Sequence, residues 1–128
     1  MATTPADLGD SQYVLLTTYR RSGIGVATPV WAARNGDALV VTTSDRSGKV
    51  KRLRNSPKVT VQACGPTGKP KRGSVPVGGR AEILVGRAAN AAAAPLRTKY
   101  GIQYKLGRAA ERLFGERGHV VILRITAA

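Results

Sequence analysis

Apolar residues gather in several short stretches rich in β-branched and aromatic types, which is the composition of β-strands, and Val59, Val61 and Ala63 also alternate with polar residues. The stretches are residues 11–19, 24–33, 38–43, 58–64, 74–85 and 119–126. Asn35-Gly36 between two of them predicts a tight hairpin, because both residues tolerate the positive φ angles of a type I′ turn. Pro29 cannot donate a ladder hydrogen bond, so its strand is expected to be bulged or at an edge there. Gly78-Gly79 predicts a second bulge.

A short helix is predicted between the third and fourth of these stretches. Val50 and Leu53 are three residues apart there, which places both on one face of a helix. Ser47 is a suitable N-cap, and Pro57 forces a stop, so the helix is expected between them. Residues 87–114 are rich in alanine and helical in character, with interruptions near Pro95 and Gly101.

The order of these elements predicts the fold class. Short strands with hairpin-length connections favour a closed antiparallel barrel. The chain has 128 residues, which suits one domain with one core. We therefore expect residues 1–128 to form a single, mainly β domain with a few short helices. Residues 1–10 are expected to be a loose N-terminal arm with room for a helical turn.

Positive charge dominates the composition. Lys and Arg number 21 and Asp and Glu number 7, so the net charge is +14. No acidic residue occurs between Asp45 and Glu82. The basic residues of that interval are Arg46, Lys49, Lys51, Arg52, Arg54, Lys58, Lys69, Lys71, Arg72 and Arg80. Such a stretch is either a solvated face or a binding site for a polyanion.

Few side chains could carry catalysis by themselves. His119 is the sole histidine and Cys64 the sole cysteine, which leaves no catalytic triad, transition-metal cage or intrachain disulfide. We expect His119 to be a surface or core residue and Cys64 a small buried thiol. An enzyme with this inventory needs a cofactor to supply the chemistry. Three features lead us to expect a cytoplasmic protein. A single cysteine suits a reducing compartment. No apolar run approaches the ~20 residues of a membrane span, and the first residues lack a secretory signal pattern.

One segment has the features of a site for an anionic cofactor. Thr43-Ser44 ends a predicted strand, and Ser47-Gly48 opens the predicted helix. Free backbone N–H groups and the positive end of a helix favour an anion at this position. Lys49 and Lys51 add positive charge, and Gly48 allows close approach.

The order and spacing of several segments resemble a known family. The segments are Tyr13-Val14-Leu15-Leu16-Thr17-Thr18, Thr28-Pro29-Val30-Trp31, Gly36-Asp37-Ala38-Leu39, Gly48-Lys49-Val50-Lys51-Arg52-Leu53-Arg54, Pro57-Lys58-Val59, Lys99-Tyr100-Gly101 and Val121-Ile122-Leu123-Arg124-Ile125. Over residues 8–126 the chain resembles the flavin and deazaflavin oxidoreductases of the FMN-binding split β-barrel superfamily, which includes the pyridoxamine 5′-phosphate oxidases. The closer resemblance is to the actinobacterial branch that uses coenzyme F420, a deazaflavin.

The resemblance implies a homodimer with cofactor sites between the subunits. In such a site Lys49, together with Ser47-Gly48, would hold the cofactor phosphate, and Thr43-Ser44 would lie beside it. The strand segment Thr28-Pro29-Val30 would lie along the ring of the cofactor. Trp31 would line the acceptor pocket, and a core tryptophan is an equal alternative for it.

The chain departs from several relatives at one position, because Ser47 stands where they carry an arginine. The phosphate site then depends more on Lys49, Lys51 and Arg54, which weakens the case for FMN. Coenzyme F420 has a phosphodiester and an oligoglutamate tail, and such a polyanion suits the acid-free stretch 46–81.

The sequence therefore predicts a cytoplasmic homodimer that binds coenzyme F420 and transfers a hydride between its reduced form and a small organic acceptor. Two alternatives share the fold: an FMN-binding oxidase or flavin carrier, and a protein that binds F420 without turnover. A basic nucleic-acid-binding barrel is the third alternative. Single-strand recognition usually needs aromatic stacking platforms, and the basic stretch contains no aromatic residue, which argues against nucleic acid. The acceptor and the direction of transfer stay open.

Overall fold

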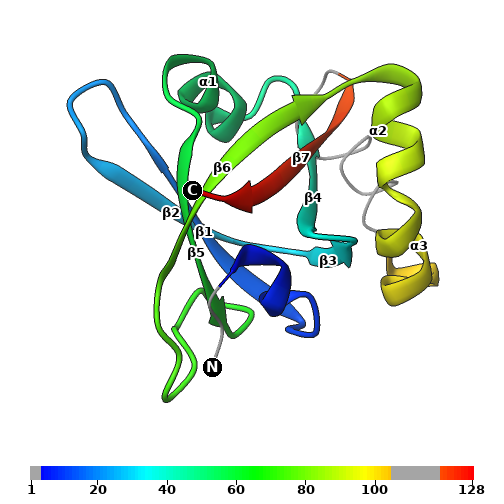
Figure 1. The fold of residues 1–128 in the computed structure, drawn as a ribbon, viewed down its shortest axis with the longest axis horizontal. Helices are drawn as coiled ribbons and strands as arrows, with labels where there is room; N and C mark the ends of the chain where they lie inside the picture. The colour runs from blue at the N-terminus through cyan, green and yellow to red at the C-terminus, as the bar shows by residue number, and fades with distance from the viewer. Residues whose placement is uncertain (1–3, 105–118) are drawn as a thin grey trace.

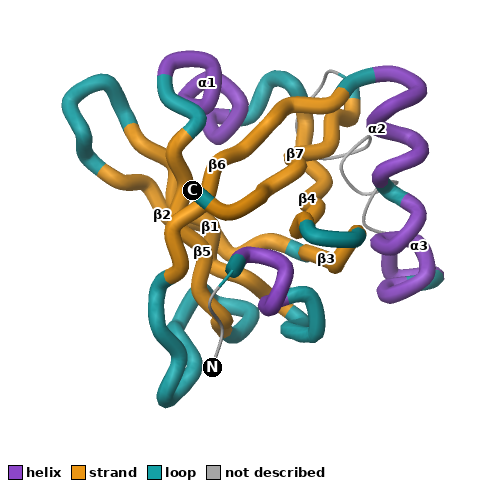
Figure 2. The backbone as a smooth tube through the Cα atoms, viewed as in Figure 1, coloured by secondary structure: helices purple, strands orange, loops and turns teal. Residues whose placement is uncertain are grey.

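The computed structural model describes residues 4–104 and 119–128. In chain order its elements are the 3₁₀-helix η1 (Pro5–Leu8), β1 (Tyr13–Tyr19), β2 (Gly25–Val30), β3 (Ala32–Asn35), β4 (Ala38–Ser44), α1 (Gly48–Asn55), β5 (Lys58–Cys64), β6 (Val77–Leu84), α2 (Gly86–Ala92), α3 (Ala94–Tyr100) and β7 (Val120–Ala127). Strands dominate, with α1 at one end of them and α2 and α3 along one side (Figures 1 and 2). The predicted fold class is confirmed.

The strands form one antiparallel sheet in the order β2-β1-β5-β6-β7-β4-β3. Strands β2 and β3 lie at opposite edges of this sheet, yet they are neighbours in the chain and are separated only by Trp31. A sheet can satisfy both conditions only if it curls until its edges approach each other. The sheet therefore forms a barrel.

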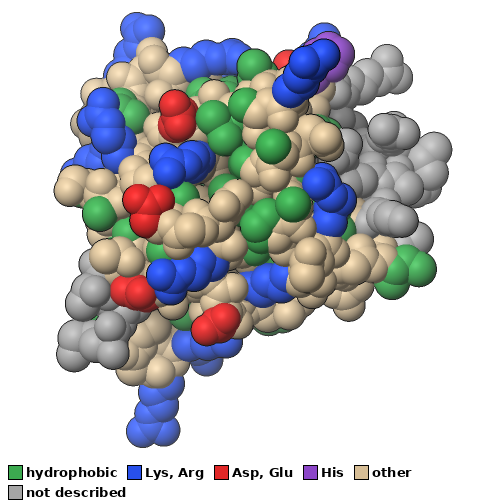
Figure 3. Space-filling model, turned by 45° about the vertical axis from the view of Figure 1, so that its right-hand side comes forward, with side chains coloured by type: hydrophobic (Ala, Val, Ile, Leu, Met, Phe, Trp, Pro, Cys, Tyr) green, Lys and Arg blue, Asp and Glu red, His purple; other side chains and the backbone are tan. Residues whose placement is uncertain are grey.

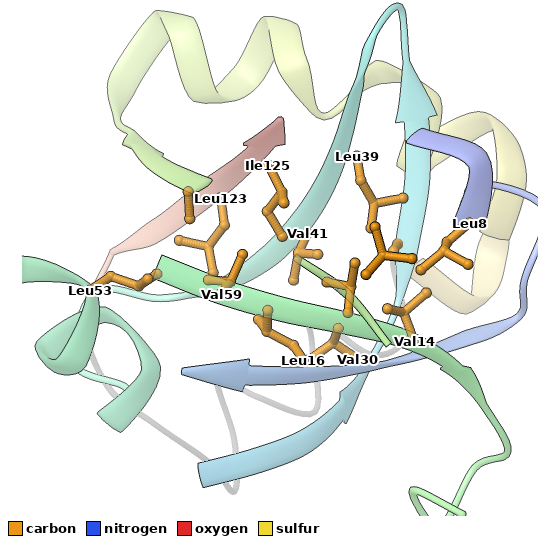
Figure 4. Close-up of a cluster of buried hydrophobic side chains, with 14 of the residues drawn as sticks. Leu8, Val14, Leu16, Val30, Leu39, Val41, Leu53, Val59, Leu123 and Ile125 are labelled. Carbon is orange, nitrogen blue, oxygen red and sulfur yellow. The ribbon is translucent and has the colours of Figure 1, made fainter. Parts of the chain in front are cut away.

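Strand register decides which side chains fill the barrel. Along β1, Val14, Leu16 and Thr18 are fully buried, while the residues between them are half-buried. Other strands send alternate residues to the same interior, where the side chains point toward one another (Figure 4): Val30, Leu39, Val41, Val59, Leu123 and Ile125. Each such side chain contributes about 1.5–3 kcal/mol by leaving water. The barrel interior is thus the main source of stability.

A second apolar cluster lies on the outer side of the barrel. Val40 of β4 and Ile122 of β7 point away from the interior and pack against Leu96 and Tyr100 of α3. The alternation of β4 places Val40 on this face because Leu39 and Val41 face the interior. Strand β4 is consequently buried on both faces over this stretch.

Helix α3 is fastened to the barrel by two adjacent side chains. The Lys99 Nζ donates hydrogen bonds of 2.7, 2.6 and 2.6 Å to the carbonyl oxygens of Gly9, Ser11 and Ala32. The Tyr100 hydroxyl accepts a 3.1 Å bond from the Ala32 N–H. Burial lowers the pKa of Lys99, although Asp10 acts in the opposite direction. Lys99 therefore joins three segments that are far apart in the sequence.

The hairpin after β3 differs from the predicted one. Asn35 pairs with Ala38, so the two turn residues are Gly36 and Asp37. Gly36 has a φ of +64°, and no other residue type has a positive φ in the described ranges. A positive φ at the first turn position alone is the pattern of a type II′ turn. The prediction of a type I′ turn on Asn35-Gly36 was wrong, because the ladder extends one residue further than the sequence suggests.

Pro29 was expected at a bulge or at a sheet edge, and the edge position is confirmed. It lies in the edge strand β2 directly opposite Leu15, and the strand is interrupted at Trp31. The bulge predicted at Gly78-Gly79 is absent. Gly79 pairs with Val59 in a continuous ladder. A Cβ on Gly79 would come within 2.9 Å of the Thr126 carbonyl oxygen. This glycine therefore permits close packing and does not mark a bulge.

The N-terminal segment is more ordered than a loose arm from residue 4 onward. Pro5–Leu8 form the helical turn that the sequence allows, and Ala6 and Leu8 are buried. The turn closes one end of the barrel interior, where Leu8 joins the core. The predicted helical character of residues 105–114 falls outside the described residues.

Candidate cofactor site

The barrel is open where β2 and β4 separate. The ladder between β3 and β4 ends at the pair of Ala32 and Val41. Beyond it, β2 runs beside β1 while β4 continues beside β7 as far as Ser44, and no ladder joins β2 to β4 in the described ranges. We call this opening the split. Thr28-Pro29-Val30 borders it on the β2 side and Thr43-Ser44 on the β4 side, so the structure brings the two predicted segments to one feature.

Helix α1 begins directly after the β4 side of the split. Ser47 has extended backbone angles, and its hydroxyl accepts a 3.3 Å hydrogen bond from the Val50 N–H. The predicted N-cap is therefore confirmed. The N–H of Gly48, the first residue of the helix, has no acceptor within the helix. This end of α1 offers backbone donors and a positive dipole end to an anion.

Arg52 belongs to the last turn of α1, but its guanidinium reaches back to the first residue of the helix. The sequence analysis did not single it out. A Cβ placed on Gly48 would lie 2.8 Å from Arg52 Nη1, so the guanidinium packs directly against the backbone of Gly48. The Nε of Arg52 donates a 2.6 Å hydrogen bond to Thr18 Oγ1. The spacing from Gly48 to Arg52 is four residues, which places both on one face of a helix. That spacing is the signal that could have identified Arg52.

No acidic side chain of the described ranges forms an ion pair with Arg52. Burial lowers its pKa, and the positive charge of Arg20 lowers it further. The nearest acidic residues in the sequence are Asp45 and Glu82, on either side of the acid-free stretch. The Arg52 guanidinium is therefore fixed by its hydrogen bond to Thr18 and carries a positive charge beside the helix N-terminus. A charged hydrogen-bond donor in this position would stabilise an anion.

Two buried hydroxyl groups on the strands of the split lack partners. Thr28 Oγ1 and Thr42 Oγ1 are buried, and neither makes a hydrogen bond to any described residue. Thr28 pairs with the fully buried Leu16, so the Thr28 side chain is on the interior face of the sheet. An unsatisfied buried hydroxyl costs about 1–3 kcal/mol. Such a group beside the split is suited to bonding a ligand, and this observation fits a ring with polar edges.

The remaining predicted cations lie at different depths. Lys49 is half-buried in the first turn of α1, next to Gly48. Lys51 is exposed. Arg54 is exposed in the last turn, so α1 carries it away from the N-terminus. Of the cations on α1, Lys49 is therefore next to Gly48 in the first turn, and Arg52 contacts Gly48 through its guanidinium.

Trp31 occupies the break between β2 and β3. Its ring is stacked on that of Tyr100, with centroids 4.6 Å apart and an interplanar angle of 6°. It is half-buried and packs against the second apolar cluster. One face of the indole therefore packs against Tyr100. The role of Trp31 in lining the acceptor pocket stays a prediction and would involve the other face.

A cavity of about 520 Å³ lies on the outer side of β7, below α2 and α3. Ala89, Ala93 and Ile122 give it apolar walls, and Asp45 and His119 are at its rim. Its volume falls in the range of small-molecule sites. Asp45 follows Ser44, so the cavity adjoins the β4 side of the split. The sequence could not indicate it, because three separate elements form it.

The other candidate groups are structural or peripheral. Cys64 is fully buried, as predicted, and burial raises the pKa of its thiol. His119 is exposed, in line with the predicted surface or core role, and its backbone N–H donates a 3.0 Å hydrogen bond to Asp45 Oδ1.

The described residues contain no cluster of three metal-ligating side chains. None of the described helices has the length and apolar character that crossing a membrane requires.

The curled sheet and its split define the chain as a split-barrel protein. A family model described as pyridoxamine 5′-phosphate oxidase matches residues 5–127, and the chain belongs to this family. No curated protein matches the sequence at a significant level.

Several solved structures share the fold. The heme storage protein HutZ from Vibrio cholerae has a TM-score of 0.68 and 13% identity, over 93% of this chain and 83% of that one. A conserved hypothetical protein from Mycobacterium tuberculosis has a TM-score of 0.68 and 22% identity, over 95% and 77%. A protein described as an F420 reductase has a TM-score of 0.57 and 21% identity, over 95% and 92%. At these identities the likeness concerns the fold alone.

Proposed function

We propose that this chain is an oxidoreductase that binds coenzyme F420 and transfers a hydride between the reduced deazaflavin and a small organic acceptor. The observation that carries the proposal is the position of the α1 N-terminus. It lies at the β4 side of the split, where Arg52 contacts Gly48, and Thr28 of β2 borders the split from the other side. An anion site and a place for a ring therefore adjoin each other.

The anionic part of the cofactor is assigned to the start of α1. The Gly48 N–H, the helix dipole, Lys49 and Arg52 would together hold the phosphodiester. No acidic residue lies between positions 46 and 81 to repel the cofactor's further negative charges. The acid-free stretch favours a polyanionic deazaflavin over FMN. On the face of the molecule drawn in Figure 3, by contrast, Lys and Arg side chains are interspersed with acidic ones.

The ring is assigned to the split, along Thr28-Pro29-Val30. Strand β2 is an edge strand, so the backbone groups on its outer side are available to a ligand. The buried Thr28 hydroxyl adds one more hydrogen-bonding group. The deazaflavin supplies the hydride when bound, and the residues of the split orient it and exclude water. The cavity beside Asp45 is large enough for a small organic acceptor.

A second copy of the chain is proposed to complete the site. Ala27 and Pro29 are exposed on the outer side of β2, and Leu15 beside them is half-buried. Exposed edge strands are usually covered in native proteins. Light scattering at micromolar concentration should report a homodimer. A monomer that still binds the cofactor would contradict this part of the proposal.

The central experiment is a side-by-side titration of the purified protein with oxidised coenzyme F420, FMN and hemin. We expect F420 to bind most tightly. Tighter binding of FMN would favour the flavin oxidase or carrier, and tighter binding of hemin would favour a function like that named for HutZ. Oxidation of the reduced cofactor by a panel of small organic acceptors then separates an enzyme from a protein that only binds F420.

A further inference from the structure

A second basic pocket lies at the end of α1 that is remote from Gly48. It occupies about 360 Å³ between the β1–β2 hairpin, the last turn of α1 and the start of β5. Its lining includes Arg20, Arg21 and Lys58, together with Tyr19 and Asn55. Three positive charges from two distant segments of the sequence therefore converge on one depression.

Neutral partners hold two of these cations in place. Arg21 Nη2 donates a 3.1 Å hydrogen bond to Asn55 Oδ1. The Lys58 ammonium lies 4.8 Å from the centroid of the Tyr19 ring, and the Tyr19 hydroxyl is hydrogen-bonded to Thr60 Oγ1 at 2.7 Å. An amide oxygen and an aromatic face position a cation without cancelling its charge. The pocket is thus pre-organised and remains positive.

Within the part of the chain that the structure describes, no carboxylate forms an ion pair with these cations. The ion pairs of the described residues join Arg34 to Asp7 and Arg124 to Asp37, and neither involves the pocket. The charge of Arg20 instead acts on Arg52, whose pKa it helps to lower after the larger effect of burial. Like charges held at short range are destabilising, and a bound anion relieves that repulsion.

We propose that this pocket is a second anion-binding site, separate from the α1 N-terminus, that takes a carboxylate or phosphate group. Arg21 would contribute a planar pair of donors and Lys58 a point charge, which suits either group. Arg20 links the pocket electrostatically to Arg52 and so to the first site. The anion could come from the acidic tail of the proposed cofactor or from a separate small anion, and the chemistry of recognition is the same.

Free anions test the pocket without any cofactor. Inorganic phosphate and a triglutamate peptide are titrated while the backbone amide resonances of Gly23 and Asn55 are followed by NMR. We compare wild type with the double variant Arg21→Ala/Lys58→Ala. The control is Lys69→Ala/Arg72→Ala, which removes the same charge from the exposed loop that follows the far end of β5. The pocket variant should lose about tenfold or more in affinity, and the control no more than about twofold.

Several outcomes would overturn the proposal or locate the source of the anion. Absence of binding by either probe, or equal losses in the two double variants, would mean that only a diffuse positive field is present. Melting temperatures confirm folding, and Arg20→Ala replaces the double variant if that variant fails to fold.

A second titration identifies the source of the anion, with F420 that carries its glutamate residues and F420 that lacks them. A loss confined to the tailed form identifies the tail, whereas a loss seen with the free probes alone identifies a separate anion. If F420 fails to bind anywhere, the proposed function falls while the free-anion result still decides the pocket.

Discussion

The Nε of Arg52 donates a 2.6 Å hydrogen bond to Oγ1 of Thr18, and this contact joins α1 to β1. Thr18 is fully buried, so Arg52 satisfies a hydroxyl that water cannot reach. The same guanidinium packs against Gly48 at the start of the helix. The Arg52 side chain therefore has two roles: it stabilises this end of the barrel, and it places a positive charge at the candidate cofactor site.

Arg52→Ala should destabilise the protein by about 1–3 kcal/mol, because it leaves the buried Thr18 hydroxyl without its partner. It should also weaken cofactor binding. Urea unfolding measures the first effect and cofactor titration the second. Arg54→Ala is the matched control, since Arg54 is exposed on the same helix and its removal should change stability by no more than about 0.5 kcal/mol. Similar losses in both variants would show that the Thr18 contact contributes little.

Lys49→Ala should weaken binding of the cofactor by about 10- to 150-fold, which corresponds to ~1.5–3 kcal/mol for a hydrogen bond to a charged group. The fold should survive, because Lys49 is only half-buried. Titration and thermal melting of the variant give the two readouts. Unchanged affinity would remove Lys49 from the phosphate site.

The control for Lys49 depends on the tertiary structure. Lys58 follows the helix closely in sequence but lines the second basic pocket, so it is not a neutral comparison. Arg87 is exposed on α2, outside the acid-free stretch, and has the same charge. Arg87→Ala should alter cofactor affinity by less than about twofold, as expected for a charge screened by solvent.

Lys99→Met should cost about 3 kcal/mol of unfolding free energy or more, because three backbone carbonyl groups lose their shared ammonium donor. Methionine keeps a similar length and apolar stem, so the change isolates the donor. Chemical denaturation measures the effect, with Lys69→Met as the comparison. A variant as stable as wild type would show that Lys99 does not fasten α3 to η1 and β3.

The preference for F420 over FMN should shrink as the salt concentration rises. The extra negative charges of F420 are attracted over the ~8–10 Å range that salt screens at physiological ionic strength. Parallel titrations between low and high salt measure this change. Equal affinities at low salt, or a preference that does not respond to salt, would contradict an electrostatic basis for cofactor choice.

Local rules account for much of what the sequence predicted correctly. Stretches of β-branched and aromatic residues between turn residues located the strands, the hydroxyl of Ser47 capped α1 as expected, and Pro57 follows closely after the helix ends at Asn55. These features depend on neighbouring residues, whose spacing is visible in the sequence. The spacing of motifs likewise indicated the split-barrel family, which the match over residues 5–127 bears out.

Tertiary structure decided which side chains meet. Arg52 and Thr18 are 34 positions apart, and Lys99 and Gly9 are 90 apart. Strand register also moved the hairpin turn to Gly36-Asp37 and kept Gly79 within a regular ladder. The sequence by itself determined the strands, the helix cap and the concentration of positive charge. Only the curled sheet determined the split, the contacts of Arg52 and the separation of two basic clusters, because each depends on contacts between segments whose distance in space no local pattern encodes.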